Sequence, residues 1–175
     1  MNIKLVIGLG NPGVEYAGTY HNVGFLFIDY LKDLQKNRMI DAGLSLLSSK
    51  AYVNDSGKFV VKELKRTGAK PEELLVVHDD SDIEIGKYKL VPASSGRGAA
   101  GHHGIENIQE ALKPNNFSRL RIGIRYPTPH SEHRMRAGEF VLSPISKENH
   151  VLLMDAFKKA AEGLKQKDKL FTSST

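Results

Sequence analysis

The apolar residues of the chain form short continuous runs that alternate with longer segments of helical periodicity. Continuous apolar runs at residues 3–7 and 74–77 have the pattern of strands that are buried on both faces. Shorter or alternating runs predict further strands at 44–49, 87–91, 119–124 and 138–142. Apolar residues at helical spacing predict helices at 22–34, from 55 or 56 to 66, at 105–112 and at 151–164, with a short helical turn at 71–73.

This order of elements predicts the fold class. Strands that alternate with helices favour an α/β fold, here a single-domain three-layer sandwich whose mixed, mostly parallel central sheet is flanked by helices. The 175 residues suffice for one such domain, and no internal repeat or linker divides them. We expect the domain to cover residues 1–164 and to be followed by a basic, flexible C-terminal tail at 165–175, which has little to bury.

Composition excludes several classes of protein. The chain has no cysteine, which excludes disulfides, thiolate metal ligands and a cysteine nucleophile. No apolar run approaches the roughly 20 residues that a membrane-spanning helix needs, and the N-terminal residues resemble neither a secretory signal nor a transit peptide. We therefore expect a cytoplasmic protein that does not contact a membrane, and we take a monomer as the default.

The charge of the chain bears on its partners. The formal net charge is +5. A basic protein gains affinity for polyanions because each neutralised phosphate releases condensed counterions. Many basic proteins bind nothing anionic, so charge alone leaves both a nucleic-acid partner and an ordinary basic surface open.

Polar segments follow two of the expected strands directly. Residues 8–13 follow the first strand and residues 78–82 follow the strand at 74–77. In open α/β sheets, ligands bind beyond the carboxyl ends of the strands. Side chains from these two segments are therefore expected to share one crevice.

The first of these segments also satisfies the glycine pattern of a dinucleotide-binding loop. Gly8, Gly10 and Gly13 have the required spacing after a strand, but by itself this signal is weak. Pro12 lies where the helix of such a loop would offer free N–H groups to a pyrophosphate. No acidic residue closes a second strand about 20 residues further on. Nucleotide binding is therefore an alternative that this sequence disfavours.

A longer string around the loop indicates a different family. It comprises Gly8-Leu9-Gly10-Asn11-Pro12-Gly13, Tyr16, Thr19, His21-Asn22 and Gly24. This string resembles the N-terminal signature of the bacterial-type peptidyl-tRNA hydrolases, G-L-x-N-P-G-x-x-Y-x-x-T-R-H-N-x-G. Later motifs follow in the order of that family and extend the resemblance to about Leu142: Tyr52-Val53-Asn54-Asp55-Ser56-Gly57, His78-Asp79-Asp80-Ser81-Asp82, Gly101-His102-His103-Gly104-Ile105, Phe117 to Ile124 and Phe140-Val141-Leu142.

The resemblance implies an activity and the residues that perform it. The family hydrolyses the ester that joins a peptide to the terminal ribose of tRNA, which recycles tRNA from stalled or aborted translation, and it uses no metal or other cofactor. His21 is expected to activate water as the general base, with Asp79 orienting its ring and Asn11 near the reacting atoms. The remaining residues implied to contact the substrate are Tyr16, Tyr52, Asn54 and His103.

The partner implied by the resemblance is the acceptor end of peptidyl-tRNA. In the family, a lysine that matches Lys89 and an arginine that matches Arg121 hold the terminal 5′ phosphate. Such contacts recognise the nucleic-acid backbone and not its sequence. A basic helix face could extend this surface, or be an ordinary solvated face: Lys58, Lys62, Lys65 and Arg66.

Three features depart from the family pattern. Tyr20 stands where arginine is usual, and His103 replaces the asparagine of G-H-N-G, which the family uses near the reactive centre. His21 and Asn54 are also closer in sequence than usual, which predicts a shortened strand pair between them. The replacement at His103 leaves open a second hypothesis, in which the chain binds RNA but is impaired in catalysis.

A metal site is the last alternative. The acidic residues Asp79, Asp80 and Asp82 beside His78 could hold a divalent cation, but their spacing matches no compact calcium loop. We therefore expect no metal.

Overall fold

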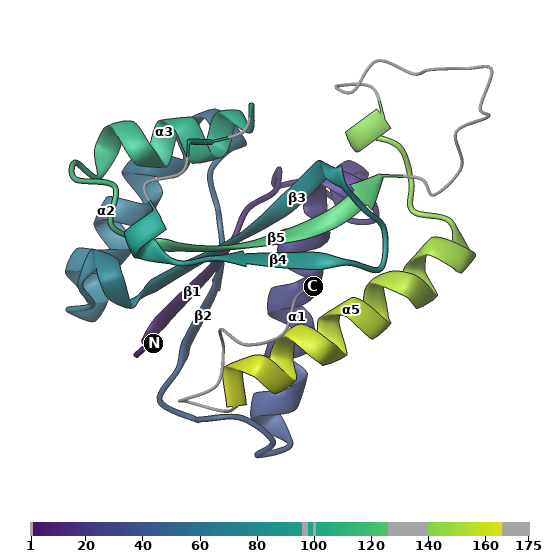
Figure 1. The fold of residues 1–175 in the computed structure, drawn as a ribbon, viewed down its shortest axis with the longest axis horizontal. Helices are drawn as coiled ribbons and strands as arrows, with labels where there is room; N and C mark the ends of the chain where they lie inside the picture. Colours follow the sequence, from purple (N-terminus) through teal and green to yellow (C-terminus); the bar gives the residue numbers. More distant parts are fainter. Residues whose placement is uncertain (1, 96–97, 100, 126–139, 166–175) are drawn as a thin grey trace.

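The computed structural model describes residues 2–95, 98–99, 101–125 and 140–165. Within them, five strands form one sheet in the order β2-β1-β3-β5-β4 (Figure 1). Their bounds are Leu5–Gly8 for β1, Ser45–Ser48 for β2, Leu74–Glu84 for β3, Tyr88–Val91 for β4 and Ser118–Arg125 for β5. Only the β4–β5 pairing among them is antiparallel. The predicted mixed, mostly parallel sheet is confirmed.

Helices cover both faces of the sheet, which confirms the three layers (Figure 1). On one face, α1 (Val23–Lys36) and α5 (Lys147–Lys165) pack against alternate strand residues, including Val6, Leu75 and Ile122. On the other face, α2 (Ser56–Thr67) and α3 (His103–Ala111) cover the intervening residues of the strands, including Ile7 and Val76. Strands that are buried on both faces in this way are apolar at every buried position, as residues 5–7 and 74–77 are.

The helix ends follow local sequence signals. Gly68 adopts a left-handed φ of 69° directly after α2, a conformation that glycine reaches without a Cβ clash. Short 3-10 helices occupy Val14–Tyr16, Tyr20–Asn22, Val53–Asp55, Pro71–Glu73 and Ala93–Ser95. None of the described helices is long and apolar enough to span a membrane.

Three expectations about individual elements need correction. The strand that was expected to end at Val77 continues to Glu84, because residues 78–84 pair with β5. The closing helix begins at Lys147 and not at residue 151. The strand predicted at 138–142 is wrong in its described part: Phe140 and Val141 are helical, and the Phe140 ring stacks on buried Tyr20.

The stretch between His21 and Asn54 contains a single strand. After α1 the chain forms β2, which pairs in parallel with β1 and ends the sheet on that side. The strand pair expected there, even in shortened form, is thus reduced to one edge strand. The tail was predicted at 165–175: Lys165 is the last residue of α5, and 166–175 lie outside the described residues, so its expected flexibility stays a prediction.

Candidate active site

The site begins where β1 ends beside β3. These strands are parallel neighbours with Gly8 opposite Val77, and the Leu9 amide donates to the Val77 carbonyl at 2.8 Å. The loop that carries Asn11 therefore leaves the sheet next to the continuation of β3, which carries Asp79. This is the shared crevice that the fold rule predicts for residues 8–13 and 78–82.

The glycines of the first loop serve close packing of the backbone. A Cβ on Gly8 would lie 2.3 Å from the Gly24 carbonyl oxygen, and a Cβ on Gly24 would lie 2.4 Å from the Leu9 carbonyl oxygen. Helix α1 therefore contacts the end of β1 backbone to backbone. This accounts for the glycine pattern without a nucleotide.

Asn22 fixes the loop after β1 to the turn that carries His21. Its side-chain oxygen accepts from the Asn11 amide at 2.9 Å, and its Nδ2 donates to the Asn11 carbonyl at 2.9 Å. On the other side of His21, Tyr20 is fully buried, and its hydroxyl accepts from Asn149 Nδ2 at 2.7 Å. Tyr20, which replaces the arginine usual in the family, thus ties the turn to α5.

The buried carboxylate of Asp79 holds His21 in position. His21 Nδ1 lies 2.9 Å from Asp79 Oδ1. Since a carboxylate only accepts, Nδ1 carries the proton and donates it. The Nε2 of the neutral ring is then an unprotonated base.

A second imidazole, which the sequence analysis passed over, shares the same oxygen. His102 Nε2 lies 3.2 Å from Asp79 Oδ1. His102 is also the N-cap of α3, where its Nδ1 accepts from the Ile105 amide at 3.3 Å. Its proton is therefore on Nε2. The available sequence signal for His102 was its place in the G-H-H-G motif.

The two imidazoles change the acidity of Asp79. Burial on its own would raise the pKa of this carboxyl, but the hydrogen bonds from His102 and His21 outweigh it and hold the pKa well below its ordinary value. Asp79 is therefore a fixed negative charge at every pH where the protein would work.

His78 is buried beside this group as a neutral ring. Its Nδ1 donates to the Asp79 carbonyl at 2.7 Å, and its ring packs edge-on to His102 at 4.6 Å between centroids. Burial, with a smaller contribution from His102, lowers the pKa of His78 well below its usual value. Its Nε2 has no partner among the described residues.

These groups open into a pocket of about 570 Å³. The pocket collects six of the seven residues predicted to act on the substrate: Asn11, His21, Tyr52, Asn54, Asp79 and His103. Tyr16 does not line it; that residue lies in the 3-10 helix Val14–Tyr16, and its carbonyl accepts from the Thr19 hydroxyl. Val141 and Leu142 form an apolar part of the wall.

The two asparagines differ in their surroundings. Asn11 Oδ1 accepts from the Val53 amide at 3.3 Å, so its NH₂ group is the part left to donate into the pocket. Asn54 is exposed at the pocket wall. Tyr52, which is 57% exposed, also lines the pocket.

Lys89 and Arg121 lie directly opposite each other on β4 and β5. Paired residues of antiparallel strands point to the same face. Arg121 Nε also forms a buried ion pair with Asp80, which lines the pocket. Neither Lys89 nor Arg121 lines the pocket itself, but Arg121 is connected to it through its ion pair with Asp80.

One group among the described residues could hold a metal ion. The ligand atoms of His21, Asp79 and His102 lie within 4.8 Å of one another. Those atoms already form two hydrogen bonds, and a metal would have to replace both protons.

A carboxylate-held imidazole in a pocket at the carboxyl edge of the sheet is an arrangement that suits a hydrolase. The model of the peptidyl-tRNA hydrolase family matches residues 5–172. The chain is 38% identical to the peptidyl-tRNA hydrolase of Aquifex aeolicus, over 94% of this chain and 89% of that protein. It is 36% identical to that of Lactobacillus johnsonii, over 89% and 87%.

A solved structure agrees with these matches. The crystal structure of peptidyl-tRNA hydrolase from Acinetobacter baumannii superposes with a TM-score of 0.78 at 34% identity, over 94% of this chain and 87% of that one. The chain belongs to the peptidyl-tRNA hydrolase family.

Proposed function

We propose that this enzyme releases peptides from tRNA by attack of a water molecule that His21 activates. Family membership supports the activity itself, hydrolysis of the peptidyl-tRNA ester and thereby recycling of tRNA. The observation that carries the mechanism is the 2.9 Å contact between His21 Nδ1 and Asp79 Oδ1 inside the pocket. It leaves His21 Nε2 free to take a proton from water.

The reaction then runs through a tetrahedral intermediate. Water attacks the acyl carbon while its proton passes to His21, and Asp79 stabilises the imidazolium that forms. The NH₂ group of Asn11, with Asn54 beside it, donates to the developing oxyanion and positions the peptide. The ester C–O bond breaks, and the 3′ oxygen leaves on the tRNA with a proton. No step needs a metal or another cofactor.

The tRNA is held outside the pocket. Lys89 and Arg121 point to one face of the sheet and are suited to bind the terminal 5′ phosphate of the acceptor end. Tyr52 and His103 contact the substrate at the mouth of the pocket, whereas Tyr16 acts at most through the turn at 14–19. The enzyme works as a cytoplasmic monomer.

Release of labelled peptide from N-blocked aminoacyl-tRNA in the presence of EDTA tests this proposal. The wild type should release peptide in chelator, and His21→Ala should be slower by at least ~100-fold, the low end for the loss of a general base. Exposed His150→Ala is the matched control and should keep the wild-type rate. A wild type that binds tRNA but releases no peptide would instead support an RNA-binding protein impaired in catalysis.

A further inference from the structure

We propose that His103 and Glu106 form a second proton-transfer pair, in which His103 donates a proton to the ribose oxygen that leaves when the ester breaks. The inference rests on the proposed hydrolysis and deepens it. It concerns a residue at which this chain departs from the family motif, since His103 stands where asparagine is usual.

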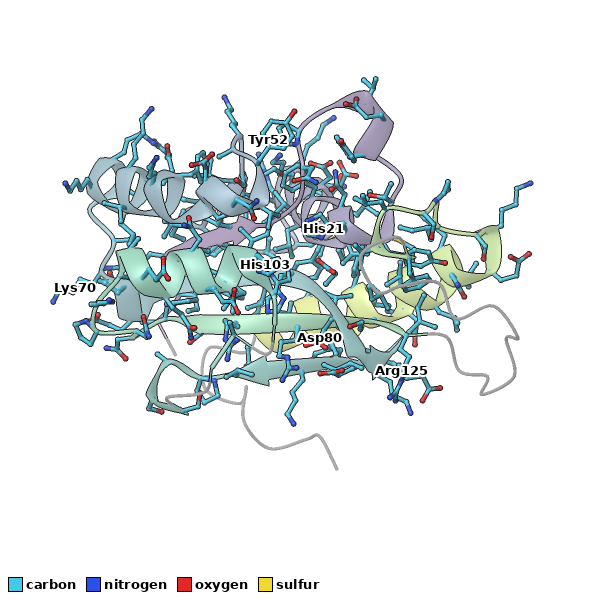
Figure 2. All side chains as sticks on the ribbon, turned by 90° about the horizontal axis from the view of Figure 1, so that it is seen from above. His21, Tyr52, Lys70, Asp80, His103 and Arg125 are labelled. Atoms are coloured by element: carbon cyan, nitrogen blue, oxygen red, sulfur yellow. The ribbon has the colours of Figure 1, made fainter. Side chains whose placement is uncertain are left out.

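The geometry of His103 resembles that of His21. Its Nδ1 lies 3.1 Å from Glu106 Oε2, one turn further along α3. As with Asp79 and His21, the carboxylate accepts from Nδ1, so Nε2 is the ring atom left for the substrate. His21 and His103 line the same pocket (Figure 2). The site thus has two imidazoles in its interior, those of His21 and His102, that a carboxylate holds, and a third at its rim.

Exposure separates the roles of the two rings. The His21 side chain is 12% exposed, whereas that of His103 is 79% exposed. A rim imidazole regains a proton from solvent after each turnover, and imidazole exchanges protons near neutral pH. The amide of an asparagine can only donate or accept hydrogen bonds. His103 therefore adds a capacity for proton transfer that the usual residue lacks.

The surroundings of His103 are polar and mostly acidic. On its own helix, Glu106 and Glu110 line an adjoining groove together with Asn54 and His103. From β3, Asp79 and Asp80 face the shared pocket, and each already has a cationic or N–H partner.

The remaining titratable side chains at the pocket are His21, Tyr52, His78 and His102, the last of which is the N-cap of the same helix. His78 and His102 are committed to Asp79, which leaves His103 as the imidazole at the rim.

The proposed step balances in protons and electrons. Water loses one proton to His21 and forms the new C–O bond. As the tetrahedral intermediate collapses, the electron pair of the old C–O bond stays on the ribose oxygen, which takes the proton from His103 Nε2. His21 then returns its proton to solvent, and His103 takes one up.

Measurement of kcat/KM against pH, with N-blocked aminoacyl-tRNA as substrate, tests this step. A base that must be unprotonated and an acid that must be protonated give a bell-shaped profile. We expect that bell for the wild type. His103→Asn should lose the falling alkaline limb and reduce kcat by about 100-fold, the low end for losing a proton-transfer group. Glu106→Gln should lower kcat in the same direction, whereas Glu110→Gln, one turn further along the exposed helix face, should match the wild type.

The outcomes separate the two proposals. If His103→Asn keeps the bell and the wild-type kcat, or gains activity, His103 is not the acid while hydrolysis through His21 stands. If the wild type releases no peptide at any pH, both the proposed function and this inference are wrong. Because His103 is exposed, its replacement should leave folding intact, which the unchanged unfolding midpoint of the variant would verify.

Discussion

At the scale of single residues, the site depends on one carboxylate oxygen that accepts two hydrogen bonds. Asp79 Oδ1 accepts hydrogen bonds from N–H groups of His21 and His102. The other ring nitrogen of His21 is left for the pocket, and that of His102 accepts from the Ile105 amide. These contacts determine the tautomers of both rings. The His21 ring is thereby held with an unprotonated Nε2 toward the pocket before the substrate binds.

His78 gives this group a measurable dependence on pH. Because burial lowers its pKa in the folded state, the unfolded chain binds a proton below about pH 6.5 that the folded chain does not. The contribution of His78 to the free energy of unfolding should therefore be complete above that pH. It should fall as the pH decreases, with a slope of up to ~1.4 kcal/mol per pH unit from this residue. Urea unfolding of wild type and His78→Asn between pH 7.5 and 5 measures the effect.

Asparagine is chosen as the replacement for His78 because its side-chain amide can still donate to the Asp79 carbonyl. The difference in unfolding free energy between wild type and variant should shrink as the pH falls, since only the wild type has the buried imidazole. A difference that is constant over this range would mean that His78 does not titrate in this way.

At the scale of elements, the position of His21 depends on how closely α1 approaches the strand ends. A Cβ on Gly24 would lie 2.4 Å from the Leu9 carbonyl oxygen and 2.6 Å from that of Val77, and neither backbone can move aside alone. Gly24→Ala should lower the unfolding free energy by ~1–3 kcal/mol, the usual cost of overpacking. It should also slow peptide release, because His21 and Asp79 lie on the elements that are forced apart.

Gly18→Ala is the matched control for that prediction. No atom lies within 4 Å of a Cβ at Gly18, which belongs to the same N-terminal segment. This variant should keep wild-type stability and activity in thermal unfolding and peptide-release assays. Equal effects of the two substitutions would contradict the packing argument.

The elements also show how far the sequence alone could predict the structure. Apolar runs and helix signals predicted β1, β2, β4, β5 and the helices, because those patterns are local. The extension of β3 through residues 78–84 depends on its pairing with β5, and the helical Phe140 depends on its contact with Tyr20. Such long-range contacts leave no periodic signal in their own segment.

The site was predictable to a different degree. The motif resemblance named His21, Asp79 and four other pocket residues, because it carries information about a whole family. It did not single out His102, whose role became visible only when the start of α3 came to lie against Asp79. It also assigned Tyr16 to the substrate, whereas the structure keeps that side chain out of the pocket lining.

At the scale of the whole molecule, the residues proposed to bind tRNA, Lys89 and Arg121, lie opposite each other on one face of the sheet. Lys89 alternates along β4 with Tyr88 and Leu90, which pack with the α1 and α5 layer, so the lysine points to the opposite face. Lys89→Ala should raise KM for the tRNA substrate, leave kcat unchanged and reduce the slope of log(1/KM) against log salt by about 1.

Lys159→Ala provides the comparison for that variant. Lys159 lies on α5, on the other side of the sheet, and pairs with Asp155 at 2.6 Å. It should leave KM and its salt dependence as in the wild type. If both substitutions weaken binding alike, the effect of Lys89 reflects only the net charge of the protein.

The central claim is that water, activated by His21, attacks the acyl carbon of peptidyl-tRNA. A single turnover in H₂¹⁸O, with enzyme in excess over N-blocked aminoacyl-tRNA, tests it most directly when the products are analysed by mass spectrometry. Attack of water on the acyl carbon predicts one ¹⁸O atom in the carboxylate of the released peptide and none in the 3′ hydroxyl of the tRNA. Released peptide without ¹⁸O, or label in the tRNA, would contradict it, because the nucleophile would then be a carboxylate of the protein or the bond broken would be on the ribose side.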